Sequence, residues 1–478
     1  MSDPIIPLRI ELPSGWIKGV HGTVAKTPSA LPLRIFKGIP YADPTDGDKR
    51  WLAPQPVTPW TGIRLCDQFG ATAIQANLPG IPGYAGDFDC LNLNVWCPQG
   101  DGPWPVMVWI PGGGFMRGGT SDALYDGSAV AYAGVVFVSI NYRVGVDGFM
   151  HFEDAAPNRG LQDQMAALQW VQQNIALFGG DPTQVTVAGV SAGAGAITHL
   201  MGLPASDMLF QRAILQSPSL QSHSLEDAAQ IRCALAGALG TAPTRQALAA
   251  VPMEALTKTL ASFLGNESLK KQYSLRPRNF FPVRPVIDGV MLKNEPLQAI
   301  EQHLQHGATN RQVLLGFNSE EMRFYLVPNG EIDRINQNRV IEFIQDIGWP
   351  HQTLSEYQAK MPLASMGDLM SCIQSDYYYC KPTLALEQLL RNAGCSTYLY
   401  EFGWSSPLHG ERMGAAHAME IPFVLGNTAS ERAQAFIGTQ APQALANDMH
   451  SRWIRFVKGE PMPDWSNTAN RLRVFKTA

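Results

Sequence analysis

Apolar runs alternate with amphipathic stretches through the middle of the chain. Residues 106–110 and 135–140 are apolar at almost every position, which is typical of strands buried on both faces of a sheet. Similar short runs predict further strands at residues 185–187, 213–216, 313–316 and 396–402.

A helix is predicted between the second and third of these strands. Its apolar side chains recur at the 3.6-residue spacing of one helical face: Leu161, Met165, Leu168, Val171, Ile175 and Phe178. Gly179-Gly180 ends the helix, and Asp181-Pro182 is expected to turn the chain into the next strand. This alternation predicts an α/β fold with a large, mostly parallel central sheet flanked by helices.

The strand predicted at 185–187 leads into Gly189-Val190-Ser191-Ala192-Gly193. A serine on so tight a strand-to-helix turn needs neighbours without bulk, which Gly189 and Gly193 supply. The G-x-S-x-G pattern therefore predicts a nucleophile elbow that presents Ser191 at the carboxyl end of the sheet. Taken alone, the motif leaves a glycine-rich turn with an idle serine equally open.

The strand at 106–110 ends in Pro111-Gly112-Gly113-Gly114-Phe115. Consecutive glycines let backbone N–H groups point into open space, where they can bind an anion or a developing oxyanion. No G-K-[ST] follows, so the pattern is not a phosphate loop. A plain turn is the alternative, but the downstream serine elbow favours an oxyanion hole.

An acid and a base follow later strands. Catalytic groups of open α/β sheets gather at the carboxyl ends of strands, and Ser191, Glu321 and His417 each follow a predicted strand there. Their order along the chain, serine then acid then histidine, is that of α/β-hydrolases. His409 and Asp376 are the alternative base and acid.

Two less regular regions complete the pattern. Residues 68–90 are loop-like and could form one wall of a substrate cleft. Residues 217–285 are helix-rich, and we expect them to form a helical cap over the active-site gorge.

Composition narrows the classes of function. The 478-residue chain has a formal net charge of −5, which argues against nucleic acid and anionic membranes as partners. No apolar run is long enough for stable membrane insertion, and no secretory leader is evident. The seven cysteines include no C-x-x-C pair, which favours reduced thiols in a cytoplasmic protein. The histidines show no metal-ligand spacing, so neither a metal nor an organic cofactor is expected.

Several longer motifs resemble those of one family. They are Phe36-x-Gly38-Ile39-Pro40-Tyr41-Ala42, Asp89-Cys90-Leu91-Asn92-Leu93-Asn94-Val95-Trp96, Asn141-Tyr142-Arg143, Gly160-Leu161-x-Asp163-Gln164, Phe178-Gly179-Gly180-Asp181-Pro182, Pro285-Val286-Ile287-Asp288-Gly289 and His417-x-x-Glu420-Ile421-x-Phe423. Over nearly its whole length the chain resembles type-B carboxylesterases, the family that includes cholinesterases and bacterial para-nitrobenzyl esterases.

The resemblance implies a fold. It is the α/β-hydrolase fold, here a single domain over residues 1–478. Residues 217–285 and 322–395 would be cap or regulatory-type insertions.

The resemblance also implies roles for the site residues. Ser191 would be the nucleophile of a Ser-His-Glu triad, and His417 the general base and then the general acid. Asn318-Ser319-Glu320-Glu321 fits the family's acid motif, which makes Glu321 the triad acid and Glu320 the alternative.

Further implied roles surround the triad. The backbone N–H groups of Gly113, Gly114 and Ala192 would form the oxyanion hole. Arg143 and Asp163 would form a structural salt bridge, and Ser217 and Glu420 would join the polar network behind the triad. The acyl side of the pocket would be lined by the 279–281 stretch with Phe280 and Phe281, together with Phe324 and Tyr325.

The chain departs from the family pattern at informative positions. Val190 replaces a common glutamate, which makes the floor of the cleft less acidic. Residues 76–89 contain no tryptophan to stack on choline, so we expect no cholinesterase activity. Ala73 stands where a disulfide partner of Cys90 is usual, and Phe88 replaces the glutamate that usually pairs with Arg50.

Taken together, the sequence predicts a serine carboxylesterase that acts on small-molecule esters through an acyl-enzyme, as a monomer or weak homo-oligomer. A non-catalytic, cholinesterase-like binding or adhesion module on the same fold is one alternative. An amidase or lipase on this fold is another.

Overall fold

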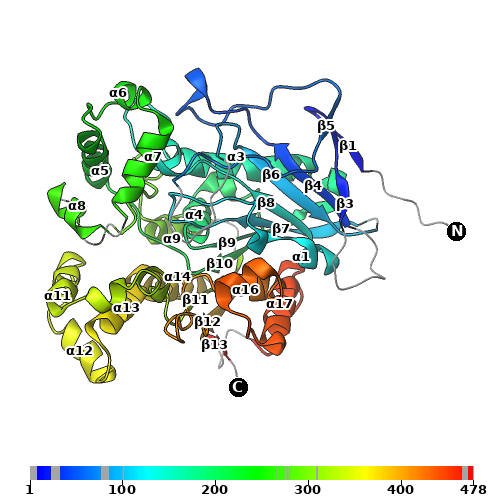
Figure 1. The fold of residues 1–478 in the computed structure, drawn as a ribbon. Coiled ribbons are helices and arrows are strands. Elements are labelled where there is room, and N and C mark those ends of the chain that lie inside the picture. Colours follow the sequence, from blue (N-terminus) through cyan, green and yellow to red (C-terminus); the bar gives the residue numbers. More distant parts are fainter. Residues whose placement is uncertain are drawn as a thin grey trace.

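The computed structural model describes residues 8–22, 33–76, 86–100, 102–264, 266–273, 275–276, 278, 280–307, 311–465 and 472–476. A ten-stranded sheet runs through its centre in the order β13-β12-β11-β10-β9-β7-β8-β6-β4-β3 (Figure 1). Its strands are β3 (Val20–Gly22), β4 (Leu33–Pro40), β6 (Asn92–Cys97), β7 (Trp104–Ile110), β8 (Val136–Ile140), β9 (Gly180–Val190), β10 (Arg212–Gln216), β11 (Gln312–Asn318), β12 (Thr397–Phe402) and β13 (Leu472–Phe475). A separate three-stranded sheet holds β1 (Arg9–Leu12), β2 (Gly15–Lys18) and β5 (Ile63–Leu65).

Strands β7 to β13 pair in parallel, and β3, β4 and β6 extend the sheet with antiparallel pairs. The predicted α/β fold with a mostly parallel sheet is therefore confirmed. One local prediction is wrong, because Asp181 and Pro182 belong to β9 rather than to a turn before it. The ladder between β7 and β9 skips in register after Trp104, and this irregularity accommodates the proline in the strand.

Helices cover both faces of the sheet. The α-helices are α1 (Ser128–Tyr132), α2 (Gly145–Phe149), α3 (Arg159–Asn174), α4 (Ala192–Met201), α5 (Leu225–Ala238), α6 (Arg245–Ala249), α7 (Met253–Ser262), α8 (Glu267–Gln272), α9 (Pro296–Gln305), α10 (Arg323–Leu326), α11 (Gln337–Asp346), α12 (Thr353–Lys360), α13 (Met366–Ser375), α14 (Lys381–Asn392), α15 (Ile421–Val424), α16 (Glu431–Ile437) and α17 (Gln443–Val457). Short 3₁₀ turns occupy Gly47–Lys49, Ala123–Tyr125, Ile175–Phe178, Pro204–Ser206 and Glu331–Arg334, and Asp376–Cys380 forms a π-helical turn.

The alternation of side chains along β7 divides the core into two layers. Val106 and Val108 pack into one layer with residues of α3 and α4, whereas Met107 and Trp109 pack into the other with residues of α17. Figure 1 shows α3 and α17 on opposite sides of the sheet. Both faces are therefore buried, which explains why the strands read as continuous apolar runs.

Two groups of helices, α5–α8 and α11–α13, lie at the left of Figure 1, and the central sheet lies to the right of both groups. They belong to the segments predicted as insertions. The strands and the irregular segments that follow them position the site described next.

Candidate active site

Ser191 stands at the turn between β9 and α4, with φ of 57°. This left-handed conformation is strained for a residue with a side chain, and the surroundings hold it in place. The Ser191 amide donates to the Gln216 carbonyl at 2.8 Å, and the Gly195 amide donates to the Ser191 carbonyl at 2.8 Å. A Cβ on Gly193 would lie 2.2 Å from the Ile110 carbonyl oxygen, so the turn requires glycine there. The structure thus has the tight strand–serine–helix turn that the motif predicts.

Glu321 and His417 are brought together from segments 96 residues apart. The His417 ring nitrogen Nδ1 lies 2.5 Å from Glu321 Oε2, and both side chains are buried. The second carboxylate oxygen of Glu321 accepts a hydrogen bond from the Asn318 amide at 2.8 Å. A carboxylate can only accept, so the proton sits on Nδ1 and the other ring nitrogen, Nε2, is left as a base. Within the described residues, Nε2 is buried without a hydrogen-bond partner.

A second buried carboxylate lies behind this pair. Glu420 accepts hydrogen bonds from Gln216 Nε2 at 2.9 Å and from Asn318 Nδ2 at 2.7 Å. Burial raises the pKa of the Glu420 carboxyl, and the nearby negative charge of Glu321 raises it further. Asn318 therefore contacts both carboxylates, one through its backbone and one through its side chain.

The expected place of Ser217 in that network is wrong. Its hydroxyl oxygen is buried without a hydrogen-bond partner among the described residues, and Gln216 contacts Glu420 instead. Ser217 follows the last residue of β10 with φ of 47°, a left-handed conformation that is uncommon for a residue with a side chain. No signal in the sequence indicated this backbone conformation.

The glycine loop after β7 lies beside the serine. Gly113 and Gly114 have φ of 128° and 63°, and both line the same cavity as Ser191. Their amides and the amide of Ala192 donate to no other group in the described parts of the chain. The loop is held from outside by Gln75, whose Oε1 accepts from the Gly118 amide at 2.8 Å. Three free amides beside a serine are the chemistry that binds an oxyanion.

Ser191 and His417 open into a cavity of about 650 Å³. The four aromatic side chains expected at the pocket, Phe280, Phe281, Phe324 and Tyr325, all line it. They contact one another edge to face, with ring centroids 5.0–5.7 Å apart. Asn279, which begins the predicted stretch, lies outside the described residues.

Two tyrosines flank the His417 ring. The ring centroid of Tyr379 lies 4.6 Å from that of His417, and the Tyr325 centroid lies 5.6 Å away. The two tyrosine hydroxyls are 3.4 Å apart. Burial raises the pKa of the Tyr325 hydroxyl, and the nearby negative charge of Glu321 raises it further. Hydrogen bonds with the Tyr379 and Ser191 hydroxyls offset only part of this rise in pKa, so the phenol stays protonated. Sequence reasoning missed Tyr379, although the run of three tyrosines at 377–379 was visible.

The alternative candidates lie elsewhere. His409 lines the cavity as an exposed residue, and its side chain has no carboxylate partner among the described residues. The Asp376 carboxylate accepts a short hydrogen bond from the Tyr357 hydroxyl instead of contacting His417. Glu320 points to a separate ionic cluster with Arg323.

Two ion pairs lie outside the cavity lining, one buried and one partly buried. Arg143 Nη2 lies 2.7 Å from Asp163 Oδ1, as the resemblance implied. Arg50 lacks the usual glutamate at position 88, and its Nε lies 3.1 Å from Asp147 Oδ1 instead. Asp147 stands on α2, far from Arg50 in sequence, so the motif around Phe88 carried no signal of this pairing.

All seven cysteines are free thiols. In the described ranges, no group of three or more His, Cys, Asp or Glu residues is placed to hold a metal ion. None of the helices in those ranges combines the length and apolar character needed to cross a membrane.

Known proteins share this architecture. The family model described as "Carboxylesterase family" matches residues 6–476. The phenmedipham hydrolase of Pseudarthrobacter oxydans is 32% identical over 450 residues, which cover 90% of this chain and 88% of that protein. The para-nitrobenzyl esterase of Bacillus subtilis is 32% identical over 453 residues, with the same coverage of 90% and 88%.

A solved structure agrees with these relatives. The crystal structure of a Geobacillus stearothermophilus carboxylesterase at pH 6.2 matches with a TM-score of 0.82 and 31% identity, covering 98% of this chain and 96% of that one. The predicted α/β-hydrolase fold and the predicted family are both confirmed. Sequence, fold and relatives agree that the chain belongs to the carboxylesterase family and is a carboxylic ester hydrolase.

Proposed function

We propose that Ser191, His417 and Glu321 hydrolyse esters as a nucleophile–base–acid triad. The observation that carries this proposal is the buried 2.5 Å contact between His417 Nδ1 and Glu321 Oε2, in the same site as a strained serine. A serine hydroxyl is a poor nucleophile until a base takes its proton. Here the base is Nε2 of His417, which the Glu321 contact leaves unprotonated.

In this proposal the reaction proceeds through an acyl-enzyme. Ser191 Oγ attacks the ester carbonyl carbon while His417 takes its proton. The amides of Gly113, Gly114 and Ala192 bind the oxygen of the tetrahedral intermediate, and one such donor is worth roughly 3 kcal/mol of barrier. The alcohol leaves with the proton from His417, and an acyl group remains on Ser191. Water, deprotonated by His417, then releases the acid and restores the serine.

The cavity supports esters with an apolar or aromatic part. Phe280, Phe281, Phe324 and Tyr325 form an aromatic wall beside the serine, and such walls bind aromatic and small aliphatic groups. The para-nitrobenzyl esterase among the relatives makes a para-nitrobenzyl ester the natural first aromatic probe. We assign no natural substrate.

Residues 217–285 and 322–395 are proposed as the cap over this cleft. Leu260 on α7 and Leu264, two residues beyond its end, line the cavity, and so do Phe343 on α11 and Met370 on α13. Each proposed insertion thus contributes apolar side chains to the cavity. Substitutions in either insertion should therefore change substrate preference more than the rate of the chemical step.

The free cysteine thiols support a reducing compartment, such as the cytoplasm, as the place of action. We further propose that the protein acts as a monomer or weak homo-oligomer, which size-exclusion chromatography with light scattering would test.

The test is hydrolysis of a para-nitrophenyl ester series, from acetate to decanoate, at about pH 8. Ser191→Ala should lower kcat by about 10⁴-fold or more. Ser219→Ala is the matched control, because Ser219 is also buried beside the turn but its hydroxyl contacts Gln221. We expect this control to stay within about twofold of wild type.

Turnover that survives Ser191→Ala would remove Ser191 as the nucleophile. A folded wild type without turnover across the series and on the para-nitrobenzyl ester would favour the non-catalytic binding module. Turnover of matched amides or long-chain glycerides above that of the short esters would favour the amidase or lipase alternative.

A further inference from the structure

His417 lies in a segment without regular secondary structure, between β12 and α15. Such a segment cannot by itself hold a ring to the fraction of an ångström that proton transfer needs. Backbone hydrogen bonds to the acid-bearing segment supply part of the support. The Glu320 amide donates to the Ala415 carbonyl at 3.0 Å, and the His417 amide donates to the Glu321 carbonyl at 3.2 Å.

The Glu320 side chain adds a further contact to the histidine segment. Its Oε2 accepts a hydrogen bond from the Ala415 amide at 3.0 Å, two residues before His417. The carboxylate fits only because position 414 is glycine. A Cβ on Gly414 would lie 1.9 Å from Glu320 Oε2. The missing side chain of Gly414 therefore provides the space that the Glu320 carboxylate occupies next to the histidine segment.

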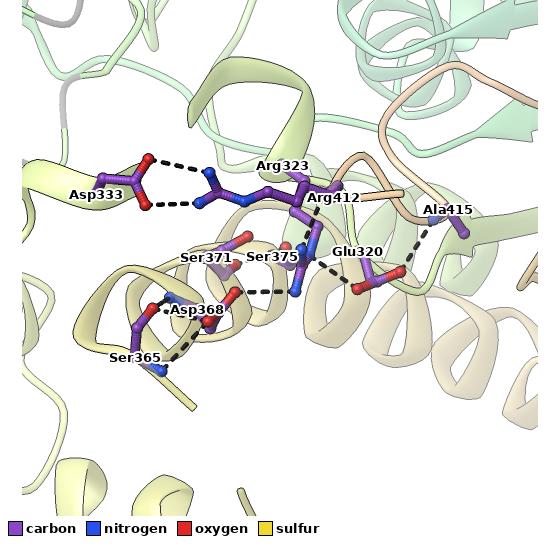
Figure 2. A network of polar contacts seen from close by, with 9 residues as sticks. All are labelled: Glu320, Arg323, Asp333, Ser365, Asp368, Ser371, Ser375, Arg412 and Ala415. Carbon is purple, nitrogen blue, oxygen red and sulfur yellow. Dashed lines mark hydrogen bonds and ion pairs between the residues drawn. The ribbon is translucent and has the colours of Figure 1, made fainter. Parts of the chain in front are cut away.

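Arg323 connects this contact to two other segments (Figure 2). Its guanidinium contacts Glu320 Oε1 at 2.8 Å, donates to the Arg412 carbonyl at 2.8 Å, and lies 2.9 Å from Asp368 Oδ1. Arg412 belongs to the His417 segment and Asp368 to the first turn of α13. One side chain thus joins the acid segment, the histidine segment and α13.

The contact between Arg323 and Asp368 provides a second route to His417, through helix α13. Asp368 also caps α13, because its Oδ2 accepts from the Ser365 amide and hydroxyl at 3.2 and 2.7 Å. The far end of α13 is tied back by Ser375, whose hydroxyl accepts from the Met322 amide at 3.0 Å. The helix then continues into the π-helical turn that carries Tyr379, the ring that stacks on His417.

We propose that Arg323 is a positioning residue that holds His417 in register with Glu321 and Ser191. This inference rests on the proposed role of His417. Arg323 does not line the cavity, so it acts through the histidine segment and through the helix behind Tyr379. Its side chain is 19% exposed and its ion pair with Glu320 is partly solvated, so its main effect is on geometry rather than on stability.

The three contacts require the planar fork of arginine. A guanidinium can present several N–H donors to three acceptors in fixed directions, whereas a lysine ammonium is a single point of charge on a flexible stem. Lysine should therefore restore the link to one or two of the segments but not to all three.

The experiment compares Arg323→Met, Arg323→Lys and Arg334→Met on a para-nitrophenyl ester. Arg334 is the matched control, because it also makes an i,i+3 ion pair, with Glu331. Within the described residues, its side chain contacts Glu331 and Asn329 but neither Arg412 nor Asp368. kcat and KM are measured separately, and kcat is expressed per folded molecule from an unfolding curve. His417→Ala is run in the same series.

We expect Arg323→Met to lower kcat by about 10- to 100-fold with KM within about twofold, since a misplacement of about 1 Å costs that much. Arg323→Lys should fall between Arg323→Met and wild type, and Arg334→Met should stay within about twofold of wild type.

Three results in Arg323→Met would each overturn the inference: an unchanged kcat, a rise in KM alone, or a loss of activity fully explained by the unfolded fraction. An equal loss in Arg334→Met would overturn it as well. Full activity in His417→Ala would instead contradict the proposed function itself.

Discussion

Glu320 and Glu321 are neighbours in sequence, yet their carboxylates serve two different polar networks. Glu321 lies in a buried network in which amides and a histidine ring surround the carboxylates, with members Gln216, Asn318, Glu321, His417 and Glu420. Glu320 lies in a partly exposed ionic network of charged side chains with members Glu320, Arg323, Asp333, Asp368 and Arg412, shown in Figure 2.

The difference shows how one segment can serve two purposes. In the buried network, short contacts in a low-dielectric interior orient the histidine and favour the charge that forms on it. The ionic network is screened by solvent, and pairs of this kind add little stability. Its arginine can nevertheless connect separate segments of chain. We infer that the first network supplies the chemistry and that the second supplies the alignment.

The largest expected effect separates the two carboxylates directly. Glu321→Gln should lower kcat by about 10³- to 10⁴-fold, because an amide next to Nδ1 no longer selects the required tautomer or balances the imidazolium charge. Glu320→Gln is the matched variant and should cost no more than the positioning loss expected for Arg323, about 100-fold at most. Steady-state kinetics on one ester compares them. Equal losses in the two variants would break the distinction between the networks.

The next prediction concerns how a buried histidine makes the stability of the fold depend on pH. His199 on α4 is buried, and within the described residues neither ring nitrogen has a hydrogen-bond partner. Burial lowers the pKa of His199 to about 4. The unfolded chain takes up a proton below about pH 6.5 and the folded protein does not, so stability falls as the pH drops from 6.5 toward 4. The loss amounts to roughly 3 kcal/mol from this ring.

His199→Leu should flatten this acid dependence even if it alters stability at neutral pH. The measurement is the free energy of unfolding by urea at several pH values between 7.5 and 4.5. His306→Gln is the control, since His306 is exposed at the end of α9. An unchanged slope in His199→Leu would show that the buried ring is not responsible.

Much of the fold was predictable from sequence because buried parallel strands and an amphipathic helix leave strong local patterns. The runs at 106–110 and 313–316 and the helical face from Leu161 to Phe178 are examples. The serine turn was predictable because Gly193 has no room for a side chain. In contrast, Tyr379 reaches His417 through the end of a distant helix, and Asp147 reaches Arg50 from another segment. Contacts between remote side chains leave no such periodic signal.

A smaller effect tests the tyrosine pair beside His417. Tyr325→Phe removes the hydroxyl that contacts the Ser191 hydroxyl and should lower kcat by about 3- to 10-fold, the value of one hydrogen bond. Tyr379→Phe keeps the ring on His417 and removes only the contact to Tyr325, so kcat should stay within about twofold. Stopped-flow kinetics of acylation would measure both. A larger loss in Tyr379→Phe than in Tyr325→Phe would contradict this assignment.

The most direct test of the central claim is covalent labelling with a fluorophosphonate followed by peptide mass spectrometry. Such a probe transfers its phosphonyl group to an activated serine hydroxyl and releases fluoride. The account predicts a single label on Ser191 in wild type and almost none in His417→Ala, because the serine then lacks its base. A label on another serine, or undiminished labelling of Ser191 in His417→Ala, would contradict it.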